Sequence, residues 1–201
     1  NNVAHPTMAG KTFDFAVVQG FSTEATHLNG DNDFVADAVT ISDLIRGAPT
    51  GEGAAVVFFQ TWARQAGHGF YPAQFADPAA MHAEIRAGYH LARDTINASA
   101  GATVSGLAPV GEAFFEAGWD GSLYSGDRSH ATVLGSRLAG LVIYRTLYEE
   151  TVSDIPYGAV SGWVGIDAAQ WAAVTGWADA VAIEPIPEPT SLALLGLGGL
   201  L

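Results

Sequence analysis

The sequence predicts an α/β domain with a parallel sheet, because short apolar runs alternate along it with longer stretches of helical periodicity. The apolar runs cover residues 13–20, 53–60 and 102–109, and each places apolar residues on both faces of the strand. Strands of a parallel sheet show this pattern because helices cover both of their faces. Three strands are few for a doubly wound domain, so we also expect a further part of the sheet upstream of residue 1.

Helical periodicity fills the stretches between and after these strands. The expected helices span 34–46, 79–98 and 131–149, and Asp167 caps a last helix that ends at residue 180. In the long second helix, apolar residues recur every three or four positions and form the inner face. This spacing puts His82 and His90 on the exposed face, with His90 and Asp94 as a surface pair.

Composition limits the partners of the protein. The 201 residues include 21 acids against 8 bases, for a net charge of -13, and 49% are apolar. Such a charge repels phosphates and anionic lipid, so we expect no nucleic-acid partner and no membrane contact through the body. The chain has no cysteine, which excludes disulfides, thiolate metal sites and a cysteine nucleophile. No motif predicts a cofactor or a metal ion.

The last part of the chain differs in composition from the body, and we divide the chain into a body, 1–182, and a tail, 183–201. Pro185, Pro187 and Pro189 favour an extended spacer. The apolar run that follows has only about half the length needed to span a bilayer. By itself the run is equally compatible with a buried C-terminal helix.

The order of residues in the tail resembles the PEP-CTERM sorting signal of Gram-negative bacteria, through Pro187, Glu188 and Pro189 and the apolar residues after them. The resemblance implies export to the cell envelope, cell surface or extracellular matrix, in bacteria that make exopolysaccharide. It also implies an exosortase-type protease as partner and membrane contact through the tail alone. The family's basic cluster is missing and no signal peptide precedes residue 1, so we expect a longer natural protein.

Asp127 and His130 form the strongest chemical motif, on a loop directly before a helix. A carboxylate three residues from an imidazole in a tight loop can hold Nδ1 and leave Nε2 as a base for a serine. An Asp-x-x-His pair is weak when it stands alone, because a helix-capping Asp beside a solvated His gives the same pattern.

The body resembles the SGNH/GDSL-type hydrolases over about residues 11 to 180. The residues that carry the resemblance are Leu107-Ala-Pro-Val-Gly-Glu-Ala-Phe114, Leu123-Tyr-x-x-Asp127-x-x-His130, Phe13-Asp-Phe-Ala-Val-Val-Gln19 and Phe58-Phe-Gln-Thr-Trp-Ala63. The resemblance implies a flavodoxin-like three-layer fold and hydrolysis of esters, often acyl groups on carbohydrates or lipids. Asp127 would orient the imidazole of His130, the general base.

The nucleophile of that family is a serine in a Gly-Asp/Asn-Ser motif after the first strand, which we expect upstream of residue 1. On this interpretation the present chain has no triad-dependent activity, and Gln19, Ser22 and Trp62 line the pocket or help to form the oxyanion hole. Gly20-Phe21-Ser22 is the alternative, since a Gly-x-Ser turn at the end of a strand can present a nucleophile.

Two functions follow from these observations. The first is an exported ester hydrolase, an esterase or deacetylase that acts on carbohydrate or related esters. The second is a non-catalytic surface or matrix protein that binds glycans with the same fold. Sugar-stacking faces would then come from tryptophans outside the motif: Trp119, Trp163, Trp171 and Trp177.

Overall fold

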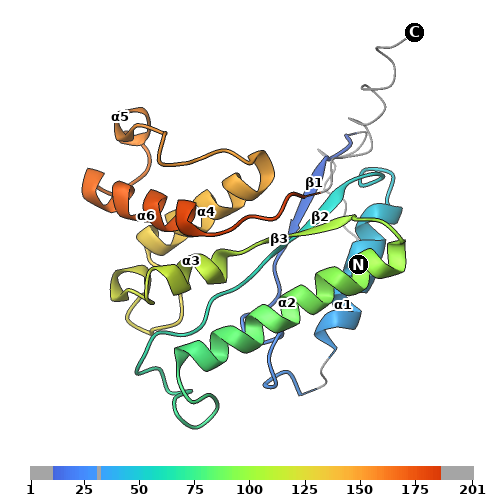
Figure 1. Ribbon diagram of the computed structural model, residues 1–201, viewed down its shortest axis with the longest axis horizontal. Coiled ribbons are helices and arrows are strands. Elements are labelled where there is room, and N and C mark those ends of the chain that lie inside the picture. The colour runs from blue at the N-terminus through green and yellow to red at the C-terminus, as the bar shows by residue number, and fades with distance from the viewer. Residues whose placement is uncertain (1–10, 31–32, 187–201) are drawn as a thin grey trace.

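A parallel sheet of three strands forms the centre of the protein (Figure 1). The computed structural model describes residues 11–30 and 33–186. The strands are β1 (Phe15–Val18), β2 (Ala55–Phe59) and β3 (Ser105–Ala108), in the order β1-β2-β3. Both strand pairs are parallel, with Val17 opposite Val57 and Val57 opposite Gly106. The predicted α/β class and the parallel sheet are therefore confirmed.

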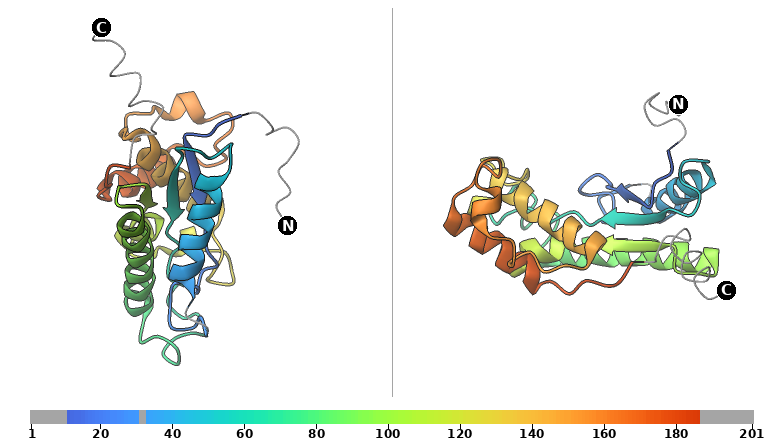
Figure 2. Two further views of the ribbon diagram at one scale, coloured as in Figure 1. Left: turned by 90° about the vertical axis from the view of Figure 1, so that its right-hand side faces the viewer. Right: turned by 90° about the horizontal axis from the view of Figure 1, so that it is seen from above.

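Two helices pack against one another over one face of the sheet, α1 (Phe34–Gly47) and α2 (Pro78–Ala100), as Figure 2 shows. Asp77 begins α2 by accepting a hydrogen bond from the backbone N–H of Ala80. Gly101 ends the helix in the left-handed conformation that glycine adopts without strain. Both helices lie close to the predicted ranges.

The remaining helices lie toward the other side of the sheet. They are α3 (Val110–Glu116), α4 (Val133–Tyr148), α5 (Tyr157–Val160) and α6 (Ala168–Ala180), with a short 3-10 turn at Gly121–Leu123 before α4. Asp167 caps α6 through a reciprocal pair of hydrogen bonds with Gln170. The helices α3 and α5 were not predicted, because they are too short to show a helical period.

Alternate residues of β2 enter different parts of the core, as the pleat of a strand requires. Val56 and Phe58 pack in the cluster that contains Phe34 of α1 and Tyr89 of α2. Val57 packs instead in a cluster with Ile143 and Leu147 of α4, together with Ala108 and Ile186. Helices thus cover both faces of the sheet, and the predicted three-layer arrangement is confirmed.

The outer face of α2 differs from the expectation at two places. His82 is buried, because α3 packs against this part of α2 and covers the imidazole, which lies 3.2 Å from a carboxylate oxygen of Glu112. Asp94 pairs with Arg93 rather than with His90. The prediction of an exposed His82 was wrong because a helix between two neighbours buries more than the stripe that faces the sheet.

None of the helices in the described part of the chain is both long enough and apolar enough to cross a membrane. The sorting motif at Pro187, Glu188 and Pro189 lies outside the described residues.

Two glycines of α4 provide a matched test of this packing. A Cβ at Gly135 would lie 2.4 Å from the backbone oxygen of Leu123, whereas a Cβ at Gly140 would meet nothing within 4 Å. We expect Gly135→Ala to destabilise the protein by about 1–3 kcal/mol, because a backbone atom must move. Gly140→Ala should stabilise it by up to about 1 kcal/mol, through helix propensity alone. Urea unfolding of both variants measures the difference, and equal effects would contradict the packing described.

Candidate active site

The loop before α4 is a tight turn that holds Asp127 and His130 together. Tyr124 and Ala131 form an antiparallel bridge at its base, and the backbone N–H of Ser125 donates to the carbonyl of His130 at 2.8 Å. Arg128, at the tip, has a positive φ of 60°, a conformation that non-glycine residues seldom adopt. Contacts within the loop itself therefore fold it back into a turn.

The Asp127 carboxylate is the centre of this turn. One oxygen lies 2.5 Å from Nδ1 of His130. The other accepts three hydrogen bonds, from the hydroxyl of Ser125 at 2.7 Å and from the backbone N–H groups of Ser129 and His130 at 2.9 Å each. These bonds favour the ionised carboxylate, so the pKa of Asp127 is far below its usual range, with the bond from His130 as the largest cause.

His130 is oriented by this contact and remains open to solvent. Its side chain is 82% exposed. Because the carboxylate accepts from Nδ1–H, the neutral ring carries its lone pair on Nε2, which is the arrangement required of a general base. Asp127 and His130 thus have the geometry expected of the acid and base of a serine hydrolase.

His130 lines a cavity of about 280 Å³ at the carboxyl ends of β1 and β2. Gln19 and Ser22 contribute from the segment after β1, and Trp62 contributes from the segment after β2. The structure therefore brings the three predicted pocket residues to the same cavity as His130. Gln19 is exposed and Ser22 is half-buried.

Trp62 contacts the loop that holds Asp127 and His130. Its ring stacks on Phe114 of α3, with centroids 4.6 Å apart and planes 6° from parallel. Its indole Nε1–H donates to the backbone carbonyl of Ser129 at 3.0 Å, next to His130. The tryptophan therefore connects the core to the residue that precedes His130.

Arg64 also belongs to this cavity, although no motif in the sequence predicted it. It lines the same cavity, is 9% exposed, and donates from Nη2 to the hydroxyl of Ser22 at 2.6 Å and from Nη1 to the hydroxyl of Ser129. Burial is the main cause that lowers the pKa of Arg64, although a guanidinium stays protonated near neutral pH. The available signal was a lone arginine placed directly after an apolar strand in a protein with few bases.

His68 and two of the tryptophans suggested as sugar-stacking faces are not among the residues that line this cavity. His68 packs against Phe70, with ring centroids 4.5 Å apart, and its Nδ1 accepts from the Phe70 N–H. Trp171 is buried and donates to the carbonyl of Ile155, so it offers no face to a sugar. Trp163 is 66% exposed.

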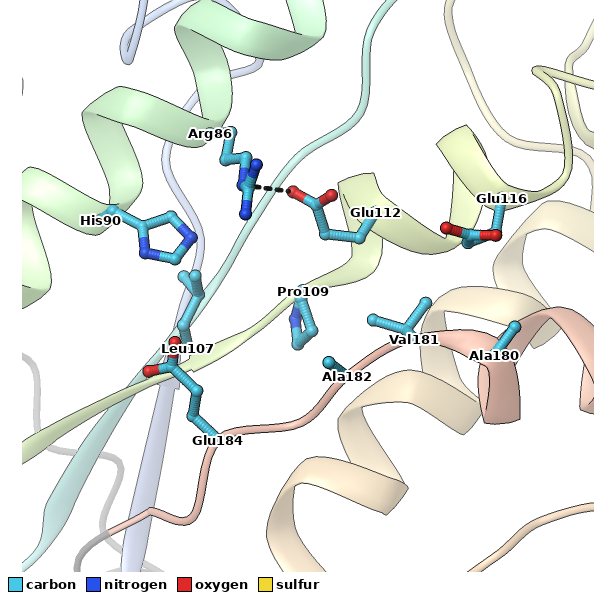
Figure 3. Close-up of a pocket in the computed structure, with 10 residues that line it drawn as sticks. All are labelled: Arg86, His90, Leu107, Pro109, Glu112, Glu116, Ala180, Val181, Ala182 and Glu184. Carbon is cyan, nitrogen blue, oxygen red and sulfur yellow. Dashed lines mark ion pairs between the residues drawn. The ribbon is translucent and has the colours of Figure 1, made fainter.

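A second cavity of about 280 Å³ lies between α2, α3 and the segment after α6 (Figure 3). Its lining contains three carboxylates, Glu112, Glu116 and Glu184. Glu112 contacts Arg86 at 3.4 Å and also accepts from the side-chain amide of Gln60. Hydrogen bonds from His82 and Gln60 lower the pKa of Glu112 against the effect of burial.

The described residues contain no cluster of side chains suited to binding a metal ion. No group of three or more His, Cys, Asp or Glu side chains lies close enough there to hold an ion.

Comparison with known proteins relates the chain to two solved structures. A DUF4886 family protein from Bacteroides uniformis superposes with a TM-score of 0.68 and 19% identity, over 92% of this chain and 69% of the other. A protein from Slackia heliotrinireducens, provisionally assigned as an SGNH hydrolase, superposes with a TM-score of 0.55 and 27% identity, over 70% of this chain and 69% of the other. No protein-family model and no curated protein matches the chain. The likenesses support a body with the three-layer fold of SGNH hydrolases.

The lowered pKa of Asp127 gives a test by pH. A carboxyl group whose pKa is lower in the folded than in the unfolded state stabilises the fold above the unfolded pKa, which is about 3.9. This contribution begins to decline below that value and is lost only as the pH falls through the lowered pKa of the folded state. We therefore expect Asp127→Asn to lower the melting temperature most at pH 7 and by a smaller amount near pH 3, with the difference from the unsubstituted protein shrinking further as the pH falls. Asp43→Asn, on the exposed side of α1, is the control, and an effect of Asp127→Asn that is equal at both pH values would contradict the assignment.

Proposed function

We propose that the chain supplies the acid and base of an SGNH-type ester hydrolase, with Asp127 as the orienting acid and His130 as the general base. The observation that carries this proposal is the contact of 2.5 Å between the Asp127 carboxylate and Nδ1 of a histidine that lines a cavity. An Asp that only capped a helix would not place an imidazole in this way, and Thr132, not Asp127, caps α4.

In the proposed reaction a serine hydroxyl attacks the ester carbonyl while Nε2 of His130 takes its proton. The tetrahedral intermediate expels the alcohol, which receives that proton, and leaves an acyl-enzyme. A water molecule, activated in turn by His130, then releases the acid. Gln19 lies in the cavity with an amide that can donate to the oxyanion.

We place the nucleophilic serine upstream of residue 1, in a Gly-Asp/Asn-Ser motif after a further strand. The two serines of the cavity, Ser22 and Ser129, both accept from Arg64, and no hydrogen bond joins either to His130 in residues 11–30 and 33–186. Ser22 remains the alternative within this chain.

We further propose that the protein is exported and that its substrates are acylated carbohydrates or related esters. This part rests on the Pro187-Glu188-Pro189 tail and its resemblance to sorting signals read by an exosortase-type protease. A glycan-binding protein without catalysis is the competing function, and Trp163 is the exposed tryptophan that it would use.

The esterase proposal is tested with p-nitrophenyl acetate. In a protein that includes the upstream region, we expect His130→Ala to lower kcat/KM by about 10²- to 10⁴-fold, because it removes the general base. His27→Ala is the control, since His27 is exposed and pairs with Glu84 away from the cavity. Unchanged activity of the folded His130 variant would refute the assignment of the base.

The same assay locates the nucleophile. The 201-residue chain alone should show no hydrolysis that depends on His130. Hydrolysis by this chain that is lost in both Ser22→Ala and His130→Ala would instead assign Ser22 as the nucleophile and overturn the upstream serine.

A further inference from the structure

The cavity beside His130 differs in charge from three other cavities in the described part of the chain. Its lining residues include Arg64 and His130 but no aspartate or glutamate. The three other cavities described for residues 11–30 and 33–186 each contain at least one carboxylate among their lining residues. In a protein with a net charge of -13, a cavity with an arginine and no acid stands apart.

Arg64 has no carboxylate against its guanidinium in the described part of the chain. Its charge is buried, and its polar neighbours are the neutral hydroxyls of Ser22 and Ser129. Its Nε has no hydrogen-bond partner among the described residues, and the ring of Phe70 lies 5.8 Å from the guanidinium carbon. Asp127 contributes only a longer-range attraction. Binding of an anion beside a buried cation that lacks a charged partner lowers the free energy of the system.

The two serines extend the positive character of the cavity. Each hydroxyl oxygen accepts a hydrogen bond from Arg64, so each keeps its own proton to donate. A group bound here meets hydroxyl protons and a guanidinium, and hydrogen bonds to a charged group are the stronger ones. The lining is therefore suited to an acceptor that carries negative charge.

We propose that this cavity is a carboxylate-binding subsite, so that the ester cleaved at His130 carries a carboxylate near the scissile bond. The inference rests on the proposed function for the ester and deepens it by naming the substrate class, an acylated acidic sugar of the uronic type. The protein's overall negative charge does not oppose this at close range, because physiological salt screens exposed charges beyond about 8 Å.

Binding of two matched sugars tests the proposal without any need for turnover. Methyl β-D-glucuronoside and methyl β-D-glucoside differ only in carrying a carboxylate or a hydroxymethyl group. Calorimetric titration of the full 201-residue chain should show binding of the glucuronoside, with the glucoside at least about tenfold weaker, as hydrogen bonds to a charged group require. Equal binding of both sugars, or no binding of the glucuronoside, would overturn the proposal.

Variants assign the binding to this cavity. Arg64→Gln should weaken glucuronoside binding about tenfold or more, and Ser22→Ala should weaken it about threefold to tenfold. Arg86→Gln is the matched control, since Arg86 lines the carboxylate-rich cavity, and it should leave the affinity unchanged. Should Arg64→Gln fail to fold, as judged by its melting transition, Ser22→Ala decides. Unchanged affinity in a folded Arg64→Gln or in Ser22→Ala would refute the subsite.

The outcome is separable from that of the proposed function. A chain that binds the glucuronoside through Arg64 while the longer protein shows no esterase activity would keep the subsite and refute the hydrolase. Esterase activity that depends on His130, with no preference for the acidic sugar, would keep the hydrolase and refute the subsite.

Discussion

The site depends on the docking of two loops, one after β2 and one before α4. Trp62 and Arg64 donate to Ser129, the backbone N–H of Gln65 donates to the carbonyl of Arg128 at 3.0 Å, and the Arg128 guanidinium donates to the carbonyl of Gly67. These bonds come from successive parts of one loop and meet consecutive residues of the other. The Asp127 and His130 pair is therefore positioned relative to the sheet, although both of its side chains are solvent-accessible.

Hydrogen bonds within the turn explain why an exposed pair can keep a defined geometry. Exposed ion pairs contribute little to stability, because side-chain entropy and solvent oppose them. Here the carboxylate accepts from backbone N–H groups as well as from the imidazole, so the backbone turn holds Asp127 whether or not His130 is charged. The fixed backbone provides the preorganisation that a catalytic base requires.

The positions of the strands and of the long helices along the chain could be predicted, because each element is long enough to show its pattern of apolar residues. The contact between Asp127 and His130 could also be predicted, since the two residues interact locally within a turn. Arg64 and the environment of His82 could not, because each depends on contacts between segments far apart in the chain. His82 meets Glu112, 30 residues away, and Arg64 meets Ser129, 65 residues away. Periodicity along one helix carries no information about such a neighbour.

The end of β2 shows how one short segment serves two different environments. Successive side chains of an extended chain point in opposite directions. Gln60 accordingly donates its amide to Glu112, which lines the carboxylate-rich cavity, while Thr61 lines the cavity with Arg64 and His130. Gly111 of α3 permits this close approach, since a Cβ there would lie 2.4 Å from the backbone oxygen of Thr61. Two neighbouring residues of this segment thus meet different surroundings, since Gln60 contacts a carboxylate of one cavity and Thr61 lines the cavity that contains Arg64 and His130.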